Sequence, residues 1–183
     1  MDKKITITID LEQTCNDILA ECNLIGNNLG EEANSQLEAD IKSPGGAATR
    51  SIICRAHTEA WGNVKLACHR YVRTGRTEDD NRLERLAYIK KETGEDGKEV
   101  ETVVYEKLTL DLRIPDFNTA VTDALKNHIH KYMVDYVMWR FLQNQADTKC
   151  GEYKKLAEEE DYPNIENDLT IRDNFVRRSA QFV

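Results

Sequence analysis

The sequence has few of the residues that interrupt regular structure, and it has no long hydrophobic run. Its 183 residues include only 3 prolines and 9 glycines, which argues against a loop-rich all-β fold or a low-complexity linker. No segment approaches the run of about 18 apolar residues that a membrane-spanning helix needs. A compact and mostly helical domain is the class that remains.

Sequence motifs for nucleotide binding and catalysis are also absent. There is no glycine-rich phosphate loop and no nucleophile elbow. His128 and His130 stand two apart on an expected helix, about 200° apart around its axis, so they cannot share a metal ion. Asp135 lies in an apolar stretch and is weighed as a catalytic carboxylate, with a buried salt bridge or an interface contact as the alternative. We therefore predict that the protein is not an enzyme, with no catalytic, cofactor-binding or metal-ligating residues.

The cysteines show no pattern of a metal site or a disulfide framework. There are 5 of them, an odd number without Cys-x-x-Cys spacing, and the N-terminal residues do not resemble an export signal. This usage predicts a reducing compartment and cysteines that act as small buried apolar residues. The residues concerned are Cys15, Cys22, Cys54, Cys68 and Cys150.

Apolar residues recur at helical spacing over most of the chain. We expect a strand near the N-terminus that Asp10 terminates as a helix cap, and Asp116 or Asn118 as a cap later on. Residues 119–144 form the most apolar of the expected helices and should be central. Pro163 should interrupt the last helix. The expected helices are 11–24, 31–42, 47–73, 119–144, a segment from about 147 up to Pro163, and 165–178.

Residues 83–114 are predicted to form a long β-hairpin. Strong turn residues occupy 93–98, and residues 108–114 alternate cleanly between apolar and polar. The N-terminal strand, Ile5 to Ile9, is the expected third member of the sheet. The hairpin should project from the helices, because its outer part is polar on both sides. The predicted fold is therefore mainly α with a small antiparallel sheet (α+β): one helical-bundle domain over 1–183, with residues 179–183 as a C-terminal tail.

Charge is unevenly distributed along the chain. The net charge is −8, which disfavours bulk attraction to nucleic acid or to an anionic membrane. Residues 50–76 nevertheless carry a local charge of +5, and residues 158–168 carry −6. The candidate assembly surfaces are these two stretches, the hairpin tip and the tail: Arg50, Arg55, Arg70, Arg73, Arg76, Gly94, Asp96, Gly97, Glu158, Glu159, Glu160, Asp161, Phe182 and Val183.

Two interpretations of the opposite charges stay open. They are either two solvated faces, or complementary surfaces that meet within one chain or between neighbouring copies. Complementary patches on one protomer suit head-to-tail assembly, which closes into rings. Contact of the basic helix with DNA is a weaker alternative and would not be sequence-specific, since no aromatic residues are interleaved with the basic ones.

The second half of the chain carries a recognisable pattern. A strand ends at Pro115 with Asp116-Phe-Asn118 after it. His128-Ile-His130 and then Met138-Trp139-Arg-Phe141 follow on the next helix, and a basic segment with Arg172, Arg177 and Arg178 comes last. About 70 residues, together with the N-terminal strand and helix, resemble small virion proteins from phages and prophages of Bacteroides-type hosts, including crAss-like phages.

This resemblance implies a structural virion protein, either a ring-forming head–tail adaptor or neck protein or a tail subunit. It implies copies of the chain in a ring and neighbouring portal, neck or tail proteins as partners. It also implies assembly in the host cytoplasm, no membrane and no cofactor. The alternative is a non-enzymatic helical interaction module, monomeric or dimeric, that is not part of a particle.

Overall fold

The computed structural model describes residues 2–25, 48–72, 87–93, 99–144 and 149–172. The helical elements are α1 (Leu11–Ile25), α3 (Ala48–Ala67), the 3-10 turn η1 (Thr119–Val121), α4 (Thr122–Asn144), α5 (Cys150–Lys155), the π-helical segment η2 (Leu156–Asp161) and α6 (Tyr162–Asp168). The strands are β1 (Asp2–Asp10), β2 (Ala87–Thr93), β3 (Glu99–Tyr105) and β4 (Lys107–Pro115).

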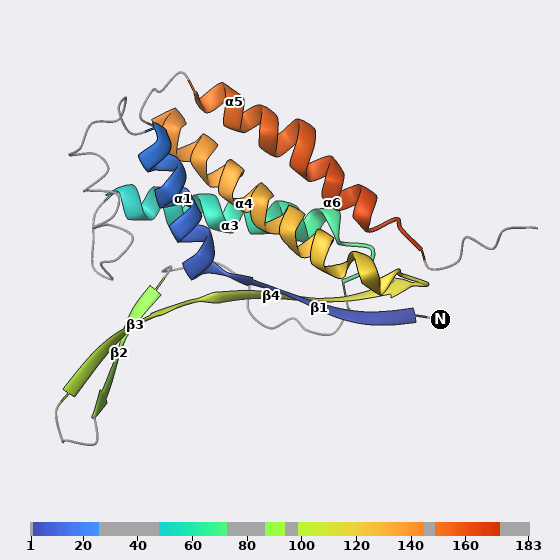
Figure 1. Ribbon diagram of the computed structural model, residues 1–183, viewed down its shortest axis with the longest axis horizontal. Coiled ribbons are helices and arrows are strands. Elements are labelled where there is room, and N and C mark those ends of the chain that lie inside the picture. Colours follow the sequence, from blue (N-terminus) through green and yellow to red (C-terminus); the bar gives the residue numbers. More distant parts are fainter. Residues whose placement is uncertain (1, 26–47, 73–86, 94–98, 145–148, 173–183) are drawn as a thin grey trace, which may run out of the picture.

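The predicted fold class is confirmed: helices dominate and the strands are antiparallel. The helices are stacked over one face of the sheet formed by β1 and β4, while the β2–β3 pair extends away from them (Figure 1). The helical body and the two-stranded ribbon are thus distinct parts of the structure.

The β1–β4 sheet forms because both strands alternate between apolar and polar residues. Ile5 lies opposite Leu112, and Ile9 lies opposite Leu108. The apolar residues of both strands are buried against the helices, while Thr6 and its polar neighbours face outward. Burial of one face therefore fixes the register, because a slip by one residue would expose every isoleucine.

The pairing of the strands differs from the prediction. β1 is not a third strand beside the hairpin: it pairs with β4, whereas β2 pairs with β3. Only Glu106 separates β3 from β4, so residues 99–115 run almost as one strand with two different partners. The hairpin proper is consequently 87–105, and residues 107–115 belong to the body. The apolar alternation of 108–114 belongs to a strand with one buried face, and the strand beside it is β1.

Helix α4 is the centre of the helical body, as its apolar composition predicts. It contacts α1, α3, α5, η2 and α6 as well as β1. Tyr132, Met133, Val137 and Phe141 are buried, and Tyr136 is half-buried. The small residues of α3, among them the buried Ala56 and Ala60, allow that helix to lie close to α4.

Pro163 does not interrupt the last helix, which is a correction to the prediction. The helix continues from α5 through η2 into α6, and Pro163 lies in the first turn of α6. The Tyr162 N–H donates to the carbonyl of Ala157, five residues earlier, which is the π-helical step. This wider turn accommodates a residue that has no N–H and whose ring would clash in a regular α-helix.

Other boundaries shift for local reasons. The helix expected over 47–73 ends at Ala67, and the chain then turns so that Val72 forms a bridge to Leu112 in β4. The helix expected over 165–178 ends at Asp168 within α6. The helix expected over 31–42 and the tail 179–183 lie outside the described residues.

Both capping predictions are resolved by the structure. The Glu12 N–H donates to Asp10 Oδ1 at 3.0 Å, so Asp10 caps α1. Between the two candidates for the later cap, Asn118 is the one: its Oδ1 accepts from the Ala120 N–H at 3.0 Å. Asp116 instead makes the turn out of β4, with φ of 49°, a conformation that aspartate tolerates better than most residues.

The Phe141 side chain provides a test of the buried face of α4. Phe141 is 2% exposed, so Phe141→Ala should lower the free energy of unfolding by about 3–5 kcal/mol. Leu66→Ala is the control, because Leu66 is 62% exposed and should change stability by less than about 0.5 kcal/mol. Urea unfolding measures both, and a loss below about 1 kcal/mol for Phe141→Ala would show that this face is not buried in the monomer.

Candidate functional site

The predicted assembly residues fall into three groups. Arg55, Arg70 and the run Glu158–Glu160 are exposed on the described surface. Asp161 is 1% exposed, so its assignment to an assembly surface is wrong, because the side chain points into the body. The third group lies outside the described part, either the whole residue or, for Arg50, its side chain: Arg50, Arg73, Arg76, Gly94, Asp96, Gly97, Phe182 and Val183.

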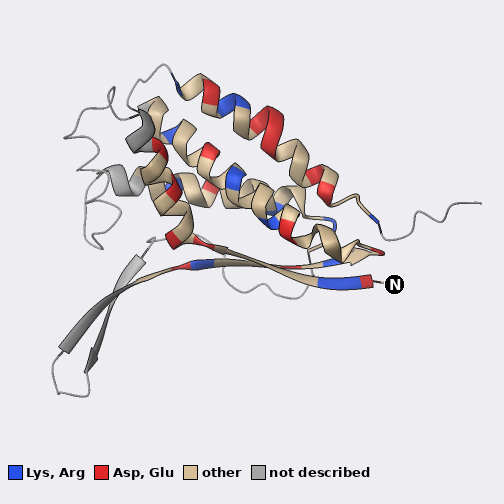
Figure 2. Cartoon of the chain, in the orientation of Figure 1, with Lys and Arg blue, Asp and Glu red and all other residues tan. Residues whose placement is uncertain are grey.

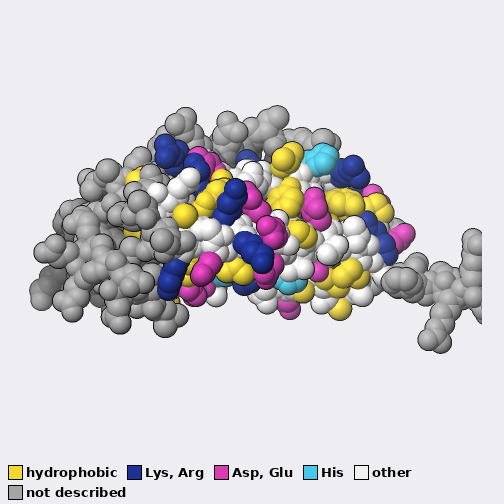
Figure 3. Space-filling view, turned by 90° about the horizontal axis from the view of Figure 1, so that it is seen from above, with side chains coloured by type: hydrophobic (Ala, Val, Ile, Leu, Met, Phe, Trp, Pro, Cys, Tyr) yellow, Lys and Arg dark blue, Asp and Glu magenta, His cyan; other side chains and the backbone are white. Residues whose placement is uncertain are grey.

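The acidic stretch exposes less negative charge than its sequence suggests. Asp161 and Asp168 are buried, and Glu158 lies 3.8 Å from Lys154 Nζ. Acidic positions recur along the ribbon of the α5–η2–α6 helix in Figure 2, and basic positions lie among them. In Figure 3, which views the body from above, charges of both signs are interspersed with hydrophobic side chains. Any electrostatic attraction from this face therefore depends on Glu159, Glu160 and Glu166.

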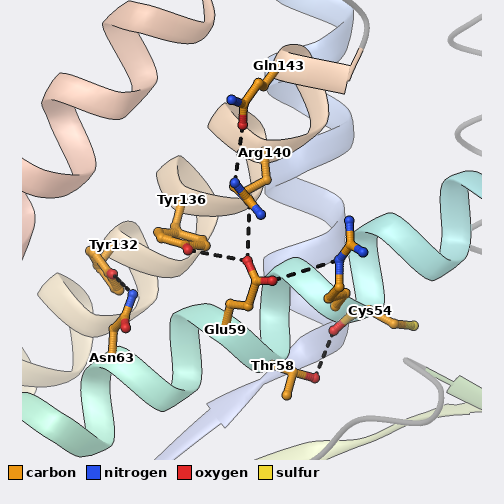
Figure 4. A network of polar contacts seen from close by, with 9 residues as sticks. Cys54, Thr58, Glu59, Asn63, Tyr132, Tyr136, Arg140 and Gln143 are labelled. Atoms are coloured by element: carbon orange, nitrogen blue, oxygen red, sulfur yellow. Dashed lines mark hydrogen bonds and ion pairs between the residues drawn. The ribbon is translucent and has the colours of Figure 1, made fainter.

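The basic stretch is anchored to the core by its one acidic residue. Glu59 on α3 accepts from Arg140 Nε on α4 at 3.2 Å and lies 3.8 Å from Arg55 Nε. Tyr136 also donates to Glu59, at 3.4 Å, and one turn along Asn63 donates to Tyr132 Oη at 2.9 Å (Figure 4). The network joins α3 to α4. Glu59 and Arg55 therefore already take part in contacts within the chain.

The ends of the basic and acidic stretches meet within the chain. A pocket of about 270 Å³ lies where the end of α3 approaches α6, with Arg70 and Glu166 both in its wall. Arg172 lies over the ring of Tyr71, a further wall residue, and donates to its hydroxyl at 3.1 Å. The alternative of contact within one chain is therefore supported at this end. The lining residues are Leu66, Ala67, His69, Arg70, Tyr71, Glu166, Leu169 and Thr170.

The two histidines of α4 point to different elements, as their spacing predicts. His128 Nδ1 lies 2.6 Å from Asp168 Oδ2 on α6, and His130 Nε2 lies 2.6 Å from Asp17 Oδ2 on α1. Each pair ties α4 to a different neighbour. Within the described ranges, no group of three or more His, Cys, Asp or Glu side chains is arranged to hold a metal ion.

Three of the cysteines are buried thiols, in agreement with the prediction. Cys15, Cys54 and Cys68 are buried, and Cys150 is half-buried. Burial raises the pKa of Cys15 to about 12, with Cys54 adding to the effect, and burial raises that of Cys68 to about 12. These thiols are protonated at neutral pH and fill space in the core. The Cys22 side chain lies outside the described part.

A buried acid pair joins α4 to η2, and sequence reasoning identified only half of it. Asp135 on α4 adjoins Asp161 on η2, and Lys131 Nζ lies 3.0 Å from Asp161 Oδ1 and 3.9 Å from Asp135 Oδ2. The i,i+4 spacing of Lys131 and Asp135 is visible in the sequence. Asp161 was not predictable as the partner, because its position depends on the π-helical turn.

Asp135 is the member of this pair whose pKa is shifted. Burial raises its pKa to about 8, and the hydrogen bond with Asp161 and the charge of Asp161 act in the same direction, while Lys131 opposes them. The carboxyl is therefore mostly protonated at neutral pH, and Lys131 balances one negative charge. Asp135 Oδ2 and Asp161 Oδ2 have no hydrogen-bond partner among the described residues. The ion pair that joins α4 to η2 is therefore the one between Lys131 and Asp161, and the mostly protonated Asp135 lies beside it.

A second buried titratable group lies on α3. His57 is fully buried, and its Nδ1 bonds the Ile53 carbonyl at 3.0 Å. Burial lowers its pKa to about 4, an effect that the backbone hydrogen bond opposes and the nearby His130 reinforces. The imidazole is therefore neutral at physiological pH and part of the core.

Comparison with known proteins identifies no relative of this chain: no protein-family model, no curated protein and no solved structure matches it. Among the helices in the described ranges, none combines the length and the apolar character needed to cross a membrane.

The acid pair predicts a specific pH dependence of stability. The folded-state pKa of Asp135, about 8, lies above its ordinary value of 3.8, so the folded protein keeps a proton that the unfolded chain releases. This contribution is complete below pH 4 and is lost as the pH rises towards 8. Asp135→Asn should therefore stabilise the protein more at pH 8.5 than at pH 5, as measured by urea unfolding.

The control for this experiment is Glu159→Gln, an exposed carboxylate on the same π-helical segment. It should leave the difference between the two pH values unchanged from the wild type. An effect of Asp135→Asn that is equal at pH 5 and pH 8.5 would contradict the protonation assigned to Asp135.

Proposed function

We propose that this protein is an assembly subunit of a virion: a ring-forming head–tail adaptor or neck protein, or a tail subunit, of a tailed phage. It acts through protein–protein contacts with copies of itself and with neighbouring portal, neck or tail proteins. The resemblance of the second half of the chain to phage virion proteins supports the type of particle. The structure contributes independent support for assembly.

The observation that carries the proposal is the β2–β3 ribbon. Its strands are seven residues long and, among the described strands, each pairs only with the other. The ribbon extends beyond the helices that cover the β1–β4 sheet (Figure 1). A two-stranded ribbon in water is marginal by itself, so a projecting one needs support from a neighbour. We therefore infer that the ribbon contacts another molecule.

Charge gives the second line of support. The exposed Arg55 and Arg70 belong to the basic stretch, and the exposed Glu159 and Glu160 belong to the acidic one. Exposed charges of opposite sign favour contact between unlike surfaces of adjacent copies where they are not already paired within the chain. Such heterologous contacts close into rings when the rotation between copies allows it.

The direct test is the mass in solution of the full chain and of a variant with a shortened ribbon. We expect the wild type to form a closed oligomer in light scattering or native mass spectrometry. Replacing residues 92–99 by a short turn should leave the circular dichroism and the melting temperature of the body nearly unchanged and should reduce the oligomer to monomer. A wild type that stays monomeric at all concentrations would instead favour the interaction-module alternative, and global unfolding of the shortened variant would show that the ribbon supports the fold.

Reversing charges on η2 tests the electrostatic part. Each exposed ion pair contributes about 0–1 kcal/mol, so several must change together. Glu158, Glu159 and Glu160 changed to Lys should weaken assembly at low salt, and less so at high salt, because ions screen the contact beyond about 10 Å at 0.1 M. Sedimentation at two salt concentrations measures this effect.

A compensating variant serves as the control. Changing Arg70, Arg73 and Arg76 to Glu in the charge-reversed protein should restore assembly if the two stretches meet between copies. Normal assembly of the first variant at every salt concentration would mean that the acidic run is only a solvated face.

A further inference from the structure

The outer edge of β1 is an open sheet edge. β1 pairs with β4 on one side, and on its other side no strand of the described part lies against it. Its nine residues contain no proline or glycine, and its pairing with β4 runs without a bulge. Proteins commonly protect exposed edges with such features or with short strands. This edge is long and regular, and is therefore suited to pairing with another strand.

Two hydrogen bonds show which backbone groups of β1 point outward. The Arg113 N–H donates to the Tyr71 carbonyl at 2.7 Å, away from β1, so Arg113 and its partner Lys4 form a pair without mutual hydrogen bonds. The Leu11 N–H donates to Glu106 at 3.4 Å, so hydrogen-bonded pairing falls on the odd-numbered residues of this end.

Both hydrogen bonds indicate the same alternation of hydrogen-bonded and non-hydrogen-bonded pairs between β1 and β4. In an antiparallel pair, hydrogen-bonded and non-hydrogen-bonded positions alternate. Ile5, Ile7 and Ile9 therefore bond to β4, whereas Thr6 and Thr8 direct their N–H and C=O groups to the open edge. The side chains of the isoleucines fill the core at the same time, so the open edge belongs to residues that the core does not use.

The opposite edge of the sheet is not equivalent. Near Arg113 it is occupied by residues 71–72, through the bond to Tyr71 and the bridge between Val72 and Leu112. Between the two edges, β1 is thus the one along which a partner strand can pair without displacing a described contact.

We propose that the outer edge of β1 accepts the β2–β3 ribbon of a second copy of this chain, extending the β1–β4 sheet across the interface. This inference rests on the proposed assembly function and names the contact that produces it. The chain's own ribbon does not reach this edge, because β3 continues from the Lys107 end of β4 and leads away from the sheet (Figure 1). The ribbon strands have seven residues and β1 has nine, so the lengths match.

The contact joins two different elements, an edge and a ribbon, so each added copy uses one of them and leaves the other unused. It is therefore heterologous and propagates from copy to copy until a ring closes. It also supplies the third strand that makes a two-stranded ribbon stable. Backbone hydrogen bonds provide the affinity in this mode of recognition, and side chains at alternate positions provide the selectivity.

Proline substitution tests the edge with a matched control. Thr8 and Thr109 are directly opposed partners in β1 and β4, and by the alternation above both N–H groups point away from the sheet. Thr8→Pro removes an outward donor and places a ring on the proposed docking edge, and Thr109→Pro does the same on the other edge. Thr8→Pro should weaken self-association about tenfold or more, a change of about 1.4 kcal/mol. Thr109→Pro should associate as the wild type does.

Mixing two variants tests the pairing itself. Thr8→Pro keeps a full ribbon but lacks a docking edge, and the variant shortened at 92–99 keeps the edge but lacks the outer end of the ribbon. Each alone should be monomeric, and an equal mixture should form a heterodimer and nothing larger. Melting temperatures of the separate variants show that both bodies are folded, so a failure to associate is not a failure to fold.

The outcomes separate this inference from the proposed function. An oligomeric wild type whose Thr8→Pro variant assembles equally well overturns the edge contact and leaves the assembly function standing. A shortened variant that still dimerises overturns it in favour of β1 pairing with β1. A monomeric wild type overturns both proposals.

Discussion

The nearly continuous strand 99–115 pairs with two different strands, and the arrangement of the rest of the structure depends on where this strand is divided. Residues 107–115 alternate between leucine or isoleucine and polar residues, so their apolar side is held by β1 and the helices. Residues 99–105 pair only with β2 among the described strands and leave the body. The division at Glu106 converts what would be a three-stranded sheet into a covered sheet and an uncovered ribbon. The β1–β4 sheet is covered by helices of the same chain, whereas no further strand of the described part lies beside the ribbon.

Polar contacts join α4 to the helices around it. The Glu59–Arg140 pair connects it to α3, the His130–Asp17 pair to α1, and Lys131 with the acid pair to η2. These polar contacts are individually modest, but they surround a buried apolar surface that supplies most of the stability. They also consume charges that would otherwise be counted as surface. Many of the charged residues in the two stretches are therefore paired within one chain. The open edge of β1 is a better-defined contact surface than the charged faces.

The sequence predicts the fold class, the cap at Asp10, the central helix and the burial of three cysteines, because each depends on local periodicity or a single residue type. It does not predict the division of the strands into two sheets, since apolar alternation in 108–114 shows that a face is buried but not which strand lies beside it. It also places a break at Pro163, because a π-helical turn has no simple sequence signature. Asp161 illustrates the same limit at the candidate site: a carboxylate in an acidic run looks exposed, and only the turn that carries it directs it to Lys131 and Asp135.

The most direct measurement for the central claim is hydrogen exchange of the backbone amides of β1 in the separated and the assembled protein. In the monomeric variant with the shortened ribbon, the amides of Ile7 and Ile9 should exchange slowly and those of Thr6 and Thr8 quickly, because only the first two are bonded to β4. In the assembled wild type all four should exchange slowly, because the ribbon of a second copy covers the open edge. Fast exchange at Thr6 and Thr8 in the assembled protein would contradict the account.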